Sequence, residues 1–225
     1  MTDLKRWKSC LSPDIHAIDA EFICIEPYTS AVHAEPLYSA ICGAKHEELW
    51  RYIPLVMPTS AESLDGILQM MASSPAHGWR VVFFADPRTN EPLGTASYMR
   101  IRPEHGSAEV GNIILSPKLQ RTRAATQAMY LMASYLFDDL GYRRYEWKCN
   151  EQNHASKRAA LRLGFTYEGT FRNDMVVKGE NRDTAWFSII DTQWPAVKAA
   201  LEAWMAPENF DEHDQQRKPL EEFRS

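Results

Sequence analysis

The chain has 225 residues and a formal net charge of -5, and 44% of its residues are hydrophobic. This apolar content can form a sizeable core and excludes a globally disordered chain. The acidic balance, without a long lysine or arginine cluster, argues against a nucleic-acid-binding protein, which usually presents a basic face. We therefore expect one globular unit whose partners are neutral or cationic.

The N-terminus and the cysteines indicate where the protein works. The chain begins MTDLKRWKSC, without the apolar run of a signal peptide, and no segment approaches the ~20 apolar residues of a membrane span. The 4 cysteines form no CxxC pair and have no histidine at zinc-ligand spacing. We expect a cytoplasmic protein with reduced thiols, no bound metal and no membrane contact.

The first half of the chain predicts an arm, a strand, two helices and then three strands. Residues 1–20 lack clear periodicity and are interpreted as an N-terminal arm. Alternation predicts a strand over 21–28, and apolar stripes predict helices over 33–43 and 60–73. Three further strands are predicted over 79–86, 93–102 and 108–115. Because no helix separates these three, they indicate an antiparallel meander.

The second half of the chain alternates strands with helices, which indicates a partly parallel sheet. The predicted elements are a helix over 122–140, a strand over 143–150, a helix over 153–163, strands over 165–171 and 184–190, and a helix over 194–205. Segment 172–183 is interpreted as a loop. The strand at 143–150 alternates strictly and places Arg144, Glu146 and Lys148 on one face.

Together these elements predict a mixed α/β fold, with a central mixed sheet of about seven strands and helices on both faces. Residues 21–206 are expected to form one domain, and 207–225 a charged C-terminal tail that is solvated or draped on the surface. The last strands leave open a homodimer that pairs them across two copies.

The junction after the strand at 108–115 has the features of an anion-binding site. The sequence IILSPKLQRTRAATQA runs from an apolar strand through a short loop into a long helix. A helix N-terminus presents free N–H groups and a partial positive charge, and small residues let a phosphate approach the backbone. Arg121 and Arg123 add positive charge. An ordinary solvated helix start is the alternative interpretation.

The order of these motifs resembles the GNAT family of acyl-CoA N-acyltransferases, in which a strand, a Q-x-x-G-x-G/A loop, a long helix, a strand, an Asn helix and G-F follow one another. The matching segments here are QRTRAA at 120–125, NHAS at 153–156 and LGF at 163–165. The last two resemble the subgroup that includes ribosomal-protein N-terminal acetyltransferases. The resemblance covers about residues 93–190, with a weaker match from residue 21.

The resemblance implies a role for each matching position. The residues that would bind the cofactor are Ile113, Ile114 and Leu115 along the pantetheine arm, Gln120, Arg121, Thr122, Arg123, Ala124, Ala125 and Thr126 around the pyrophosphate, and Asn153 and Ser156 beside the thioester. Acetyl-CoA would be the co-substrate. The acceptor would be a primary amine, on a small molecule or a peptide N-terminus.

Two positions depart from the family pattern. Arg123 stands where the family usually has glycine, which is costly if the position needs a positive φ. In a regular helical turn, by contrast, Arg123 fits and its guanidinium serves the phosphates. Ala160 stands where many members have a tyrosine seven residues after the asparagine, so a tyrosine acid at that place is excluded. These departures leave a CoA-binding module without catalysis as the alternative to an N-acyltransferase.

Acyl transfer from a thioester to an amine needs a base, a stabilised oxyanion and a leaving thiolate. Glu109 is the candidate base, because alternation places it on one face with Gly111 and Ile113, and Gly111 leaves room beside it. A glutamate facing solvent is the alternative. Ser156 is the candidate donor to the leaving sulfur, and its alternative is a helix cap shared with Asn153.

Overall fold

The computed structural model describes residues 4–73 and 78–224, so residues 1–3 of the expected arm and Ser225 of the expected tail lie outside it. Eight strands form one sheet in the order β1-β2-β3-β4-β5-β6-β8-β7. They are β1 (Ile18–Asp19), β2 (Cys24–Pro27), β3 (Arg80–Ala85), β4 (Pro92–Arg102), β5 (Ser107–Leu115), β6 (Arg144–Asn150), β7 (Thr166–Val177) and β8 (Glu180–Ile190). The strand beyond the seven expected is the two-residue β1, within the expected arm.

Five α-helices cover this sheet in the described part of the chain. They are α1 (Ser30–Ile41), α2 (Ala61–Ser73), α3 (Arg123–Ser134), α4 (His154–Arg162) and α5 (Trp194–Met205). A π-helical turn, Tyr135–Asp139, continues α3, and 3-10 turns lie at Leu4–Arg6, Ala44–Trp50, Pro103–His105, Pro207–Asn209 and Leu220–Phe223. None of the described helices is both long and apolar enough to cross a membrane.

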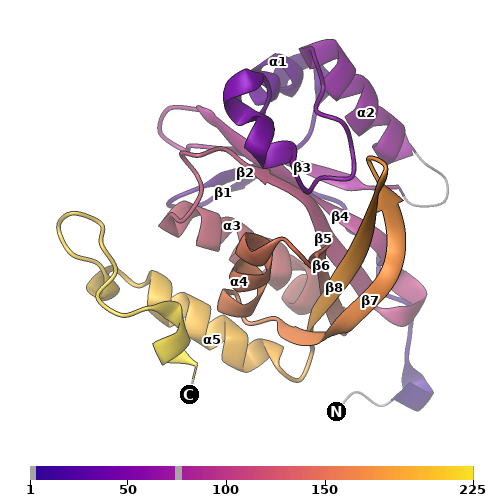
Figure 1. Cartoon of the computed structure of the whole chain (residues 1–225). Helices are drawn as coiled ribbons and strands as arrows, with labels where there is room; N and C mark the ends of the chain where they lie inside the picture. Colours follow the sequence, from indigo (N-terminus) through magenta and orange to yellow (C-terminus); the bar gives the residue numbers. More distant parts are fainter. Residues whose placement is uncertain (1–3, 74–77, 225) are drawn as a thin grey trace.

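The two groups of helices lie on opposite faces of the sheet, α1 and α2 on one and α3, α4 and α5 on the other (Figure 1). Along β3, Val82 and Phe84 belong to the core beneath α3 and α5, whereas Val81 and Phe83 belong to the core beneath α1 and α2. A strand buried on both faces must be apolar throughout. The mixed α/β fold predicted from the sequence is confirmed.

β5 and β6 run parallel and then part midway along their length. Their pairing begins at Ser107 with Arg144 and ends at Val110 with Trp147. Beyond that point β5 pairs with β4 alone, and β6 pairs with β8 alone. The backbone edge of β5 that faces β6 is therefore free from Gly111 onward within the described sheet.

A β-bulge interrupts β5 at Asn112, which has a φ of 50°. Between Gly111 and Ile114, β5 advances by three residues while β4 advances by two. The bulge reverses the alternation, so Ile114 rather than Ile113 lies on the face of Glu109. The expectation that Ile113 shares the Glu109 face is wrong, because it assumed an uninterrupted strand.

β7 and β8 form a long hairpin, and its turn approaches the end of the molecule that carries α1 and α2 (Figure 1). The expected loop over 172–183 is wrong, because both strands continue through it. Lys178 and Gly179 form the turn with φ values of 52° and 82°, as a two-residue type I′ turn requires. Bulges in β7 break its alternation and hide the strand in the sequence.

The segment 206–224 follows the surface and inserts apolar side chains into it. Leu220 is fully buried in the core beneath α3 and α5. Arg224 donates to the carbonyl oxygen of Leu161 at 2.7 Å and to that of Arg162, where α4 ends. The Trp204 indole nitrogen donates to Gln216 at 2.9 Å. The charged segment is thus packed as part of the folded chain.

Candidate functional site

The loop between β5 and α3 presents unpaired backbone amides. Thr122 caps α3, and its hydroxyl accepts a hydrogen bond from the Ala125 amide at 3.1 Å. Among the described residues, nothing accepts a hydrogen bond from the amides of Arg121, Arg123 or Ala124. Arg121 has a φ of 62°, so the chain turns there in the left-handed conformation. Converging amides at a helix N-terminus suit an anion.

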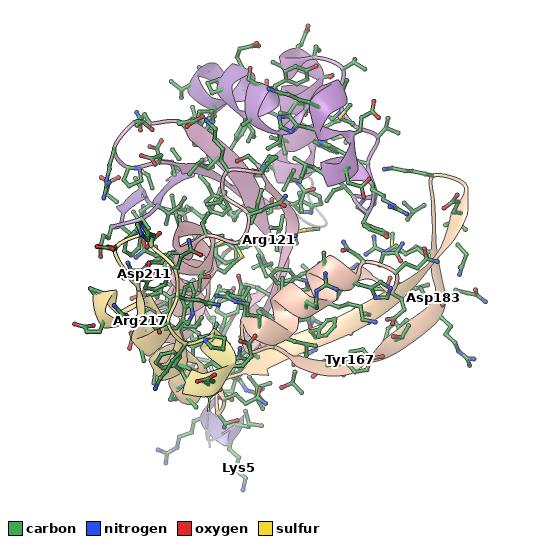
Figure 2. The ribbon with its side chains drawn as sticks, turned by 60° about the vertical axis from the view of Figure 1, so that its left-hand side comes forward. Lys5, Arg121, Tyr167, Asp183, Asp211 and Arg217 are labelled. Carbon is green, nitrogen blue, oxygen red and sulfur yellow. The ribbon has the colours of Figure 1, made fainter. Side chains whose placement is uncertain are left out.

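This loop continues the free edge of β5. Gln120 Nε2 donates to the carbonyl oxygen of Leu115 at 3.0 Å, at the end of that edge. Ile113 and Leu115 are half-buried and Ile114 is buried. The Thr126 hydroxyl is already used, since it accepts a hydrogen bond from Arg162 at 3.0 Å. In Figure 2, Arg121 can be followed on this loop, while Asp183 marks the β7–β8 hairpin.

The side chain of Arg123 is turned to the C-terminal segment. Its guanidinium carbon lies 4.0 Å from the ring centroid of Phe22 and 4.3 Å from that of Phe210. The guanidinium also donates to the carbonyl oxygen of Met205. Arg123 is the first residue of α3, and the left-handed position falls on Arg121 instead. Arginine at position 123 therefore causes no backbone strain. Its backbone N–H faces no acceptor among the described residues, whereas its side chain is engaged elsewhere.

The start of α4 is closed by its own side chains. Asn153 Oδ1 accepts from the Ser156 amide at 3.0 Å, and Ser156 Oγ accepts from the Trp147 indole nitrogen at 2.9 Å. Burial raises the pKa of the Cys149 thiol, and a hydrogen bond with Ser156 opposes part of that shift. The capping role of Asn153 and Ser156 is therefore present, and it leaves their contact with a thioester as a prediction.

Glu109 belongs to a buried network of ion pairs on the sheet face opposite α3. Its Oε2 lies 2.8 Å from Lys148 Nζ and 3.0 Å from Arg100 Nε. Lys148 Nζ is also 3.2 Å from Glu146 Oε2 and 3.7 Å from the ring centroid of Trp186. Glu109 is only 6% exposed, so the alternative of a solvent-facing glutamate does not hold.

The second oxygen of Glu109 has no ion-pair or hydrogen-bond partner among the described residues. It lies beside Gly111, where a Cβ atom would come within 3.0 Å of Glu109 Oε1 and 2.5 Å of Met99 Sδ. A larger residue at position 111 would therefore have to displace the side chain of Met99 or that of Glu109. The space expected beside Gly111 is partly filled by Met99 and by the carboxylate itself.

Glu146 anchors the far end of the same network. It accepts a hydrogen bond from Arg144 Nε at 2.7 Å and lies 3.2 Å from Arg102 Nη2. Burial raises the pKa of Glu146, but the Arg144 hydrogen bond and the Lys148 charge outweigh it, and the net pKa is below its ordinary value. The network therefore keeps Glu146 ionised around Lys148.

Sequence reasoning gave no role to Lys148 or to the β8 residues beside it. The alternation of 143–150 had placed Lys148 on the polar face, and matching that face to Glu109 would have found the pair. Arg182 lay in the segment interpreted as a loop, and Trp186 was counted only as part of an apolar strand. No local signal in the sequence distinguishes these two residues.

The parallel strands β5 and β6 separate midway, and the free edge of β5 leads to the unpaired amides at the start of α3. This arrangement agrees with the fold of the family that the sequence resembles. Residues 23–166 match the family model described as the acetyltransferase (GNAT) domain. The chain therefore belongs to the GNAT acetyltransferase family, as the sequence motifs predicted.

Relatives and solved structures agree with this assignment. The crystal structure of a GCN5-related N-acetyltransferase from Brucella melitensis has a TM-score of 0.92 and 39% identity, covering 98% of this chain and 99% of that one. The uncharacterized N-acetyltransferase YoaA of Bacillus subtilis is 30% identical over 146 residues, which is 64% of this chain and 82% of its own. The ribosomal-protein-serine acetyltransferase of Escherichia coli is 27% identical over 165 residues, 72% of this chain and 89% of its own.

Proposed function

We propose that the protein transfers an acetyl group from acetyl-CoA to a primary amine, on a small molecule or a peptide N-terminus, by direct attack on the thioester. The observation that carries this proposal is the free edge of β5 running into the unpaired amides of Arg121, Arg123 and Ala124. An exposed strand edge pairs with the amides of an extended arm, and free amides at a helix start bind a pyrophosphate.

The cofactor side of the site would use mainly backbone groups. The edge from Ile113 to Leu115 would pair with the pantetheine arm, and Gln120 would release the Leu115 carbonyl oxygen for this purpose. The turn from Arg121 to Thr126 would hold the pyrophosphate, with the exposed Arg121 side chain adding charge. Asn153 and Ser156 would then lie at the thioester end.

The base would be Glu109, acting through Oε1, because Oε2 is held by Lys148 and Arg100. Glu109 would take one proton from the substrate ammonium, and the neutral nitrogen would bond to the acetyl carbon as the carbon–sulfur bond breaks. The departing thiolate would take the second proton from that nitrogen, which leaves the amide and free CoA. The Ser156 hydroxyl would donate a hydrogen bond to the departing sulfur. A backbone N–H beside the bulge at Asn112 would stabilise the carbonyl oxygen during attack.

Release of free thiol from acetyl-CoA, measured over a panel of amines and short peptides, tests the proposal. Glu109→Gln should lower turnover at saturating acetyl-CoA by about 100-fold, since a general base contributes that much or more, while CoA affinity stays unchanged. Glu180→Gln is a control, because Glu180 is exposed at the hairpin turn.

Unchanged turnover in Glu109→Gln would remove Glu109 from the role of base. If no amine releases thiol above background while CoA still raises the unfolding temperature, the protein is a CoA-binding module without catalysis.

A further inference from the structure

Three successive side chains on one face of β8 carry buried polar atoms without partners. Arg182 Nε, Thr184 Oγ1 and Trp186 Nε1 have no hydrogen-bond partner among the described residues. Period-two alternation places all three on the same face. This is the face of the Glu109 network, because Lys148 Nζ lies over the Trp186 ring. Buried polar groups are almost always paired, so a row of three calls for an explanation.

Arg182 is the charged member of this row. It is 9% exposed, and its buried Nε has no hydrogen-bond partner among the described residues. Burial lowers the pKa of Arg182, and the nearby charges of Asp174 and Glu109 offset only part of this shift. A buried cation without a hydrogen-bonded counter-charge is costly. A planar guanidinium is best matched by a carboxylate that accepts two parallel hydrogen bonds.

Contacts at the end of the hairpin hold this row in place. Lys178 Nζ donates to the carbonyl oxygen of Trp50 at 2.8 Å, and the Tyr52 hydroxyl donates to that of Gln152 at 3.2 Å. They tie the hairpin and the start of α4 to the connection between α1 and α2. Arg182 is therefore presented on a fixed element, and an arriving anion does not have to order it.

The spacing along β8 indicates how the anion relates to the reacting amine. Arg182 is four residues from Trp186, or about 13 Å along a strand, and Trp186 contacts the lysine that binds Glu109. A peptide that lay along β8 would have its amine at the Trp186 end and a later residue at the Arg182 end. An extended peptide gains about 3.5 Å per residue, so an acidic side chain two or three residues into a peptide fits.

Building on the function proposed above, we propose that Arg182, with the neighbouring Thr184 hydroxyl, binds a carboxylate side chain near the start of a peptide acceptor. The acceptor class is then a peptide N-terminus with an acidic residue at its second or third position. The Arg182 end of the row binds the carboxylate, while the Trp186 end, next to Lys148 and Glu109, receives the amine.

Calorimetric titration of paired peptides in the presence of CoA tests this site without requiring turnover. The pair is a C-terminally amidated tetrapeptide with glutamate at its third position and the same peptide with glutamine there. The wild-type chain should bind the glutamate peptide about 10- to 100-fold more tightly, the worth of hydrogen bonds to a charged group. Arg182→Gln should abolish the preference, and Arg182→Lys should keep part of it.

Arg172→Gln is the matched control, because Arg172 is an exposed arginine on the neighbouring strand β7, and it should retain the full preference. Equal binding of the two peptides by the wild type, including no binding of either, overturns the proposal. A preference that survives in Arg182→Gln overturns it as well.

Turnover separates the two proposals. Tight binding of the acidic peptide, with no thiol release for it or for any amine of the panel, would sink the proposed function and leave the Arg182 site standing. Equal binding and equal acetylation of both peptides would overturn the Arg182 site and support the proposed function. Thermal unfolding of each variant, with and without CoA, confirms that it is folded.

Discussion

Two junctions lead from the parallel strands into helices, and the chain completes them differently. At the start of α4, Asn153 accepts a hydrogen bond from the Ser156 amide, and nearly every amide of the turn has a partner within the chain. At the start of α3, Thr122 caps only the Ala125 amide, and three neighbouring amides have no described partner. We call the junction at α4 closed, because its amides are paired within the chain, and the junction at α3 open, because three of its amides are not. The unpaired amides, rather than the pattern, mark the candidate anion site.

A carboxylate placed at the second residue of each helix tests most directly whether only the open junction binds an anion. Alanine occupies that position in both helices, as Ala124 in α3 and Ala155 in α4. Ala124→Glu should weaken CoA binding by about 100-fold, since opposing like charges costs several kcal/mol. The helix itself should not suffer, because an acidic side chain in the first turn is favourable. Calorimetric titration with CoA measures the effect.

Ala155→Glu is the matched control and should change CoA affinity by less than about threefold, under 1 kcal/mol. Similar losses in the two variants would show that the closed junction carries the phosphates as well.

The two arginines of the open junction should separate stability from binding. Arg123→Gln should lower the free energy of unfolding by about 2–3 kcal/mol, because it removes two ring contacts and a charged hydrogen bond. Arg121→Gln should leave stability unchanged and weaken CoA binding about fivefold in low salt, the worth of an exposed charge pair. Urea unfolding and CoA titration of both variants provide the measurements. The opposite distribution of effects would contradict the placement of the Arg123 side chain.

Removing either helix cap should lower the free energy of unfolding by the same amount, and by less than Arg123→Gln does. Thr122→Ala and Asn153→Ala should each lower the free energy of unfolding by about 1 kcal/mol, because each cap satisfies one amide of its helix. Urea unfolding measures both. A negligible loss at Thr122 would mean that the first turn of α3 is fixed by other contacts, and the difference between the junctions would then lie elsewhere.

The smallest expected effect concerns pH. At the closed junction, hydrogen bonds from Lys157 and Thr170 lower the pKa of Glu151 from its ordinary 4.5. Its stabilising contribution is therefore complete above pH 4.5 and is lost as the pH falls below that value. Wild type and Glu151→Gln should differ in unfolding free energy by less than about 1 kcal/mol at pH 7, as for a surface pair.

This difference between the two proteins should disappear in acid when urea unfolding is repeated across the pH range. The open junction has no acidic residue between 116 and 126 to titrate. A difference that persists well below pH 4.5 would show that Glu151 acts through packing rather than charge.

Local rules predicted much of the fold and part of the site. Gly141 and Gly164 directly follow the helices predicted over 122–140 and 153–163, and they have φ values of 69° and 97°, as residues that end a helix often do. The strict alternation of 143–150 placed Lys148 on the polar face that the structure shows. These features depend on residues within a few positions of one another, so one sequence is enough to predict them. The candidate anion-binding loop was predicted in the same way, from a strand end beside a helix start.

The remaining features depend on contacts between distant segments. The bulge at Asn112 is a response of β5 to β4, although asparagine tolerates the positive φ better than most residues. Arg123 was expected to reach toward phosphates, but its position is set by Phe22 and Phe210, which are remote in the sequence. The lack of a hydrogen-bond partner for the buried Arg182 Nε can be recognised only once the strands of the sheet are assembled.

The aromatic clamp around Arg123 has an evolutionary consequence. Arginine stands there in place of the glycine common in the motif it resembles, and its charge is enclosed by Phe22 and by Phe210 of the segment 206–224. A homologue that lost this segment would leave the Arg123 side chain without Phe210 at the N-terminus of α3. Selection would then favour a small residue at that position. Arginine at this position and the C-terminal extension should therefore be inherited together, so that either one signals the other in a newly read genome.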